Sequence, residues 1–289
     1  MRKIDYHADD YGISMSASRH IIELIKAGKL DSISIMPNMP AFDESMELLS
    51  EEWDTLAIKP KVSIHLNLID GHSLVDGKIL EYSWGYLLFY SYFRGRNYRT
   101  IKERIKKEFV CQIQKGLEYS FVNKVRLDSH LHVHMIPIVF DAMMEAVLEL
   151  GIKDRLEFVR ITREPIFLML FSKEVFGSYP VVNIIKNVLL NFLSIRVVSK
   201  LKPIGISEAM VWGMMRSGMM TEDYCRKFDN KIEKYANRKN RYVELVAHPG
   251  FGSNPAELFE CTIGDRKAII SEYRYLEYSM LMNRGNCEN

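Results

Sequence analysis

The sequence predicts a single α/β domain spanning residues 1–289, with about seven parallel strands arranged as a distorted (β/α) barrel. Strand-like segments alternate with helix-like segments along the whole chain, and this alternation is typical of parallel strands joined by crossover helices. Seven such units favour a barrel, or an incomplete barrel, over an open sheet. The polar residues best suited to chemistry also follow the strands directly, which is where barrel enzymes assemble their active sites.

Short segments of apolar or alternating residues mark the expected strands. They are Lys3–His7, Ser32–Met36, Lys61–Leu68, Lys124–Leu127, Glu157–Ile161, Lys202–Ile206 and Arg241–Ala247. Longer segments, in which apolar residues recur at helical spacing, mark the expected helices. These are Ala17–Ala27, Phe42–Glu51, Ile101–Leu117, Ile136–Leu150, Val181–Lys200, Thr221–Asn237 and Asp265–Asn283.

Two segments do not fit this simple alternation. Glu81–Arg99 is rich in aromatic residues and could be a lid, a subunit interface, or a buried helix with a loop. Residues 166–200 form a long apolar segment, which we expect to be a helical insertion that is buried or faces a partner. Charged residues interrupt it at Lys173, Glu174, Lys186 and Arg196. Because no charge-free span of roughly 18 residues remains, we expect no membrane span. Both segments would suit a homodimer interface.

Composition excludes several classes of protein. The net charge is only +2 and acids and bases are interspersed, so charge gives no argument for binding to nucleic acid or to a membrane surface. No GxGxxG, P-loop, GxSxG or HExxH signature is present, which argues against nucleotide cofactors and the best-known hydrolase classes. No apolar stretch of a signal peptide follows the N-terminus. The cysteines form no CxxC pair and are expected to be free thiols of a cytoplasmic protein: Cys111, Cys225, Cys261 and Cys287.

The clearest chemical signal is the segment Asp128-Ser-His-Leu-His-Val-His134. In an extended chain, the carboxylate and the three imidazoles would share one face, because side chains alternate with period two. Such a face would be a poor choice for a core, since each ring nitrogen needs a partner. It suits a metal site, although three ligands from one strand rarely converge on one ion.

Other strand ends carry the residues that could complete such a site. His65 lies on the polar face of the clean alternation in Val62–Leu68. Asp9 and Asp10 follow the first strand, and neighbouring side chains in an extended chain point apart. We therefore expect the two aspartates to divide the work, one binding a metal ion and the other remaining free as a base.

Two later strand ends provide further candidates. His248 stands where the final strand meets the Pro249-Gly250 turn, a position that suits a general acid. Arg160 and Arg163 follow another strand and could orient a catalytic carboxylate or a substrate, or lie at the surface.

Four motifs together resemble the YdjC-like carbohydrate deacetylases, a family that includes chitooligosaccharide (diacetylchitobiose) deacetylases. They are His7-Ala-Asp-Asp-Tyr-Gly-Ile-Ser14, Ser63-Ile-His-Leu-Asn67, Leu127-Asp-Ser-His-Leu-His-Val-His-Met135 and Ala247-His-Pro-Gly-Phe251. The motifs occur in the same order as in the family and cover nearly the whole chain. Two features depart from the family pattern: Tyr11 stands where phenylalanine is usual, and residues 166–200 are unusually long and apolar.

The resemblance implies a role for each matched residue. Asp10, His65 and His130 would bind one divalent metal ion, which is Mg²⁺ by family expectation, with Zn²⁺ also fitting two nitrogen ligands. Asp9 would be the general base and His248 the general acid. The residues expected to surround the ligands or the substrate are Asp128, His132, His134, Arg160 and Arg163.

The resemblance also implies an activity in carbohydrate metabolism. The protein would be a hydrolase that removes an N-acetyl group from an amino sugar or a chitooligosaccharide, so that its partner is a small carbohydrate substrate. Two alternatives stay open: a metal-dependent phosphoesterase on a similar barrel, which usually binds more ions, and a catalytically silent carbohydrate-binding protein.

Overall fold

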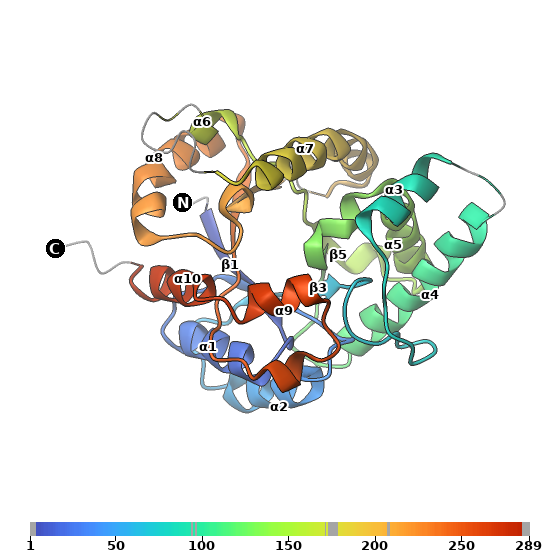
Figure 1. Ribbon diagram of the computed structural model, residues 1–289, viewed down its shortest axis with the longest axis horizontal. Coiled ribbons are helices and arrows are strands. Elements are labelled where there is room, and N and C mark those ends of the chain that lie inside the picture. The colour runs from blue at the N-terminus through green and yellow to red at the C-terminus, as the bar shows by residue number, and fades with distance from the viewer. Residues whose placement is uncertain are drawn as a thin grey trace.

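Seven parallel strands form one sheet that curls into an open half-barrel (Figure 1). The computed structural model describes residues 4–93, 95, 97–170, 172, 179–206 and 209–284. The strand order is β5-β4-β3-β2-β1-β7-β6, so β5 and β6 are the two edges. The strands are β1 (Ile4–Tyr11), β2 (Ser32–Ile35), β3 (Lys61–Leu66), β4 (Val125–Ser129), β5 (Leu156–Val159), β6 (Ala209–Trp212) and β7 (Tyr242–Ala247). The predicted α/β class and the incomplete parallel barrel are confirmed.

Helices cover the outside of the sheet and surround its open end (Figure 1). They are α1 (Met15–Lys26), α2 (Phe42–Trp53), α3 (Trp84–Tyr92), α4 (Asn97–Gly116), α5 (Pro137–Glu149), α6 (Phe167–Leu170), α7 (Val181–Leu201), α8 (Glu222–Lys239), α9 (Ile263–Ile269) and α10 (Tyr273–Met282). The helix expected over Asp265–Asn283 is two helices, and the aromatic segment contains α3.

One expected strand is wrong. Lys202–Ile204 forms a short 3-10 turn after α7, and β6 begins only at Ala209. Gly205 follows the turn with a φ of 74°, a left-handed conformation that glycine adopts without strain and that a strand does not contain. The apolar pattern at residues 202–206 therefore reflects the end of a helix.

The two faces of each strand have opposite character. On β1, Tyr6 and Ala8 face outward into the core against the helices, whereas Asp5, His7 and Asp9 are buried inside the half-barrel. β2, β3, β4 and β7 add further polar groups to the interior, with Ser32, Ser34, Ser63, His65, Arg126, Asp128 and Glu244 all buried. The apolar core thus lies outside the sheet, and an ionic network fills its concave side.

Glu164 links the two edges that the strands leave unpaired. It is buried and accepts hydrogen bonds from the backbone N–H groups of Gly213 at 2.8 Å and Met215 at 2.9 Å, just after β6. The Asn187 side chain of α7 also donates to it, and a backbone bond joins Val211 N–H to the Arg163 carbonyl oxygen at 3.1 Å. A buried carboxylate thus fastens α7 and the segment after β6 to the segment after β5.

The apolar insertion is largely the long helix α7. Of the described helices, that spanning Val181–Ile204 is long and apolar enough to cross a membrane by length and composition alone, with a mean hydropathy of 1.6. Only 28% of the 18-residue window with this hydropathy is buried inside the protein. The expectation of a buried helix is therefore met on one face only, and the expected homodimer stays a prediction.

The described cysteines are free thiols, as expected: Cys111, Cys225 and Cys261. Cys287 lies outside the described residues, as do Lys173 and Glu174 of the insertion.

Glu164 should make stability depend on pH. Burial raises the pKa of its carboxyl group from an ordinary value of 4.5 to about 7. The folded protein then binds the proton more tightly than the unfolded chain, so this stabilisation is complete below pH 4.5 and is lost as the pH rises through 7. We expect the unfolding free energy to be about 3 kcal/mol lower above pH 7 than below pH 4.5.

Urea unfolding of the wild type and of Glu164→Gln between pH 5 and pH 8 measures this effect. The variant should have a clearly flatter dependence of unfolding free energy on pH, whatever its absolute stability. Equal slopes for the two proteins would contradict the assignment.

Candidate metal centre and catalytic site

A β-bulge at the end of β1 directs two neighbouring carboxylates to one place. The pairing of β1 with β2 shifts register between Ala8 and Tyr11, and Asp10 has a left-handed φ of 67°. A bulge changes the direction in which a side chain points and is frequent beside active sites. The aspartates therefore lie within the strand, not after it as the sequence suggested, and both are buried.

Asp10, His65 and His130 form a group that could hold a metal ion. Their ligand atoms all lie within 4.8 Å of one another, and all three residues are buried. Asp10 Oδ1 is 3.7 Å from His65 Nε2 and 3.2 Å from His130 Nδ1. One carboxylate and two imidazoles leave further coordination positions open, as a catalytic metal requires. These are the three ligands that the motifs implied.

Asp128 orients His65 for this purpose. The register of β3 and β4 places the two residues side by side, and His65 Nδ1 lies 2.7 Å from Asp128 Oδ1. A proton held on Nδ1 by this carboxylate leaves a lone pair on Nε2, the nitrogen that faces Asp10. The chemistry of the donor set therefore fits a divalent cation.

The three histidines after β4 do not share a face, so the expected extended conformation is wrong. β4 ends at Ser129, and His130–Met135 is a 3-10 segment in which Leu131 and His132 have positive φ values of 48° and 58°. Non-glycine residues in this region are rare and strained, and such strain gathers at functional sites. The turn sends each imidazole in a different direction.

Only His130 reaches the metal group. His134 turns away and lies 2.7 Å from Ser129 Oγ and 2.8 Å from the Arg160 carbonyl oxygen, a structural position where burial lowers its pKa to about 4. His132 lines the site cavity, and its buried Nδ1 has no hydrogen-bond partner within the described structure. Burial holds the pKa of His132 well below 6.5, so this imidazole is neutral.

Asp9 is held by a buried guanidinium. Arg160 donates from Nη1 to Asp9 Oδ2 and from Nη2 to Asp9 Oδ1, both at 2.9 Å. Burial alone would raise the pKa of Asp9, but Arg160, then His65 and His7, lower it well below 3.8. Asp9 is therefore a permanently charged carboxylate beside the metal group, with a fixed orientation.

His7 belongs to the same network, although no role was predicted for it. Its Nε2 is 3.0 Å from Asp9 Oδ1, and its Nδ1 is 3.1 Å from Glu244 Oε1. Burial lowers the pKa of His7, but these carboxylates outweigh it and raise the pKa to about 9. The alternation of Asp5, His7 and Asp9 on one strand was the signal that could have revealed this interior cation.

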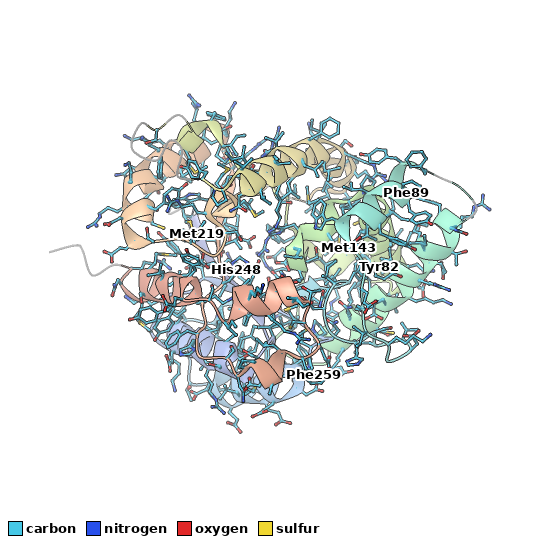
Figure 2. The ribbon with its side chains drawn as sticks, viewed as in Figure 1. Tyr82, Phe89, Met143, Met219, His248 and Phe259 are labelled. Atoms are coloured by element: carbon cyan, nitrogen blue, oxygen red, sulfur yellow. The ribbon has the colours of Figure 1, made fainter. Side chains whose placement is uncertain are left out.

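His248 lies near the centre of the molecule as drawn in Figure 2 and close to Asp9. Its Nε2 lies 3.8 Å from Asp9 Oδ2, and its side chain is 18% exposed. Glu277 of α10 positions it, accepting the His248 backbone N–H at 2.6 Å and lying 3.5 Å from Nδ1. Glu277 was not predicted, because only the tertiary fold brings α10 to this strand end.

The C-terminal helices complete the site with residues that sequence reasoning missed. Arg274 donates to Asp10 Oδ2 at 2.7 Å, which leaves Oδ1 facing the two histidines. Asp265 accepts a hydrogen bond from the Thr262 hydroxyl group and also lies 3.9 Å from His130 Nε2. With Asp70, at 3.2 Å from the same nitrogen, it forms a second group able to hold a cation.

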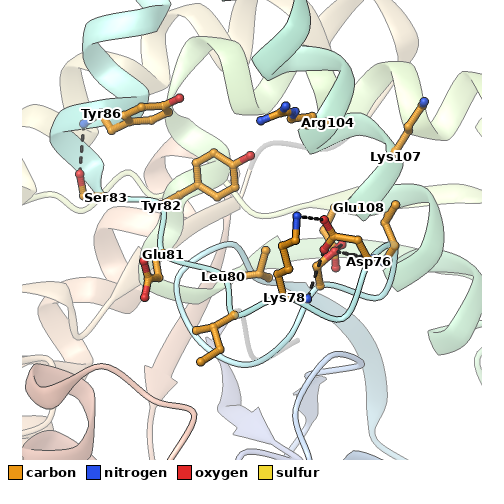
Figure 3. Close-up of a pocket in the computed structure, with 13 residues that line it drawn as sticks. Asp76, Lys78, Leu80, Glu81, Tyr82, Ser83, Tyr86, Arg104, Lys107 and Glu108 are labelled. Carbon is orange, nitrogen blue, oxygen red and sulfur yellow. Dashed lines mark hydrogen bonds and ion pairs between the residues drawn. The ribbon is translucent and has the colours of Figure 1, made fainter.

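A cavity of about 440 Å³ gathers these residues. Its lining includes five predicted catalytic and metal-binding residues, Asp9, Asp10, His65, His130 and His248. Arg160 lies behind Asp9 and acts through it, and Arg163 is not among the lining residues. A second cavity of about 530 Å³ lies between the loop after β3 and α4, where Tyr82 and Tyr86 project opposite Arg104 and Lys107 (Figure 3).

Removing Arg160 should destabilise the protein strongly. Asp9, Asp128 and Glu244 all contact this one buried cation. Without it, they would be buried charges lacking their main partner, so we expect Arg160→Met to lower the unfolding free energy by about 3–5 kcal/mol. Chemical denaturation measures the change, with Arg163→Met as the matched control. Similar stability of the two variants would contradict the central role of Arg160.

Two curated relatives share sequence with part of this chain. The protein is 32% identical over 151 residues to carbohydrate deacetylase 2 of Listeria innocua, and 33% identical over 150 residues to a carbohydrate deacetylase of Clostridium beijerinckii. Each match covers 52% of this chain and 58% of the relative, so the chain spans little more than half the length of these proteins.

A solved structure from Enterococcus faecalis, provisionally named a cellobiose-phosphate cleavage protein, has the same fold. The TM-score is 0.57 at 18% identity, over 98% of this chain and 91% of the other. The model of the family described as YdjC-like protein matches residues 4–285, nearly the whole chain. The match includes the two carboxylates at the end of β1 and the histidine before the Pro-Gly turn, and the protein therefore belongs to the YdjC-like family.

Proposed function

We propose that this protein is a metal-dependent hydrolase that removes an N-acetyl group from an amino sugar or a chitooligosaccharide. The observation that carries the proposal is the placement of Asp9. Its carboxylate is fixed and ionised by Arg160, beside the group Asp10, His65 and His130, and His248 Nε2 lies 3.8 Å from it. The names of the two curated relatives point to the same chemistry.

The residues around the cavity can divide the reaction between them. A divalent ion held by Asp10, His65 and His130 would polarise the amide carbonyl and acidify a water molecule. Asp9 takes a proton from the attacking water molecule as the water oxygen adds to the amide carbonyl carbon. His248 then donates a proton to the sugar nitrogen, so that the C–N bond breaks and acetate and a free amine leave.

The donor set favours Zn²⁺ or another transition ion over Mg²⁺ as the bound metal. Two of the three ligands are imidazole nitrogens, whereas Mg²⁺ prefers oxygen and keeps several waters. Arg274 holds the second oxygen of Asp10, which leaves one carboxylate oxygen for the ion. We also propose a cytoplasmic location, in keeping with the free thiols of the described cysteines.

A metal-dependent phosphoesterase is the second candidate, favoured by one observation. Asp70, His130 and Asp265 form a further group that could hold a cation, and phosphoesterases often use two ions. Both groups share His130, however, so a second ion would have to bind the same imidazole. One ion per chain supports the deacetylase, and two ions support the phosphoesterase.

Metal binding should depend on His65. Without its imidazole, the site retains one carboxylate and one histidine, so we expect His65→Ala to weaken Zn²⁺ binding by about 100-fold or more. His72→Ala is the matched control, because that histidine pairs with Glu260 and does not line the cavity. Titration calorimetry measures both affinities. Equal affinity in the two variants would place the metal elsewhere.

Acetate release should depend on Asp9. We expect Asp9→Asn to lower kcat on diacetylchitobiose by about 10²–10⁴-fold, because the amide cannot accept the proton of water. Asp54→Asn, at an exposed carboxylate (96%), controls for the loss of one negative charge. A chelator should abolish activity and added metal should restore it. Full activity of Asp9→Asn would refute the mechanism, and sugar binding with no acetate release by the wild type would favour a silent binding protein.

A further inference from the structure

The helix α7 has an outer face that nothing in the described structure covers. Its exposed positions follow helical spacing and form one stripe along the helix. These are Val181, Val182, Ile185, Val188, Phe192 and Ile195, each between 52% and 73% exposed. The opposite face is apolar too and is buried, for example at Leu190 and Val197. A continuous exposed apolar stripe on a helix normally marks a surface that contacts another protein or a membrane.

The same helix also forms one wall of the catalytic cavity. Asn183 and Lys186 line the cavity, and Lys186 directly follows Ile185 of the exposed stripe. Among the described residues, no ion pair involves Lys186, and burial lowers its pKa despite the field of Asp265. The helix α7 therefore lines the catalytic cavity on one side, where it carries Lys186, and exposes an apolar stripe on the adjacent side.

The other helices around the cavity carry exposed apolar groups as well. α9 and α10 supply Ala268, Tyr273 and Arg274 to its wall. The exposed apolar residues of these helices and of the turn between them are Ile263, Ile270, Tyr273, Tyr275 and Leu276. Figure 1 shows α7, α9 and α10 around the centre of the view, with α3 beyond the far end of α7.

The start of α3 is tied to the same site. Trp84 donates from Nε1 to the Leu131 carbonyl oxygen at 3.2 Å, and Leu131 lines the cavity. The exposed aromatic residues of this segment are Tyr86, Phe89, Tyr92 and Phe93. The apolar exposure thus gathers on the helices that form the cavity wall or contact it.

We propose that this face docks on a lipid bilayer and that the substrate is a lipid-linked amino sugar, carried on a phosphate. This inference rests on the proposed deacetylase function and specifies its substrate class. The N-acetyl sugar would enter the cavity, the phosphate would lie beside Lys186 and Lys267, and the lipid chain would remain with the apolar stripe of α7. The helix would lie in the interface and would not span the membrane.

Two observations favour a bilayer over a second copy of the chain. A second copy seated on α7, α9 and α10 would cover the cavity that the substrate must enter, whereas a bilayer would present the substrate to it. Lys186 and Lys267 line that cavity, and such cations complement an anionic headgroup rather than another apolar helix.

Vesicle flotation tests the surface without relying on catalysis. The wild type should bind vesicles made of equal parts phosphatidylcholine and phosphatidylglycerol. The double variant Ile185→Ser, Phe192→Ser should bind at least about tenfold more weakly, because two large exposed side chains no longer enter the interface.

The matched control is Ile58→Ser, Leu148→Ser. These residues are 61% and 59% exposed and precede β3 and β5, which puts them at the opposite end of the parallel sheet. The control should bind vesicles like the wild type. Absence of wild-type binding, or equal binding by both double variants, would overturn the proposal. A dimer that dissociates only in the α7 variant, with no vesicle binding, would overturn it in favour of an interface between copies.

Kinetics then test the substrate class. On polyprenyl phosphate-linked N-acetylglucosamine in vesicles, the α7 variant should lose about tenfold in kcat/KM, and on soluble diacetylchitobiose it should match the wild type. Lys186→Gln should lower the ratio of kcat/KM for the phosphate-linked lipid to that for a neutral alkyl N-acetylglucosaminide. An unchanged ratio, or equal loss on both substrates, would refute the lipid-phosphate substrate. If no substrate releases acetate, the deacetylase function fails, while flotation still decides whether the face docks on lipid.

Discussion

The structure depends on one fully buried cation, Arg160, in the concave side of the half-barrel. Its guanidinium contacts carboxylates from three separate strands: Asp9 of β1, Asp128 of β4 and Glu244 of β7. Buried charges are costly unless they are paired and hydrogen-bonded, so each strand can keep its buried acidic residue only while Arg160 is present. A polar interior of this kind trades apolar packing for the fixed orientation of several charged groups.

Arg160 orients the proposed catalytic and metal-binding residues through two carboxylates. Arg160 fixes Asp9 directly. It also holds Asp128, the hydrogen-bond partner of His65 Nδ1, and so orients His65. One guanidinium thus positions both the proposed base and one proposed ligand without lining the cavity itself. On the other flank, Arg274 and Glu277 of α10 hold Asp10 and His248 in the same indirect way. The proposed reacting groups are therefore oriented by ion pairs and hydrogen bonds to largely buried side chains.

The sequence predicted most of the strands, and it identified more of the residues that line the cavity than of the residues that hold them. Period-two alternation identified His65, and the strand-end position identified Asp9, Asp10 and His248, because these signals are local. The turn after Ser129 was missed, since left-handed conformations at Leu131 and His132 are imposed by the surroundings against local preference. Arg274, Glu277 and Lys186 were missed for another reason: they come from helices far along the chain, and only the fold brings them to the cavity.

The open edge of the half-barrel connects the fold to the inferred substrate. A closed barrel would pair β5 with β6, and the connection between them could then be short. Here the two edges are separate, and the chain that joins them contains α7, which Asn187 and Glu164 fasten to both edges. The opening thus gives a long helix a place beside the cavity, with one face inward and one outward. The outward face of α7 is apolar, and its Lys186 faces the cavity. The opening between β5 and β6, which leaves the barrel incomplete, would therefore also adapt a deacetylase site to a substrate held at a lipid surface.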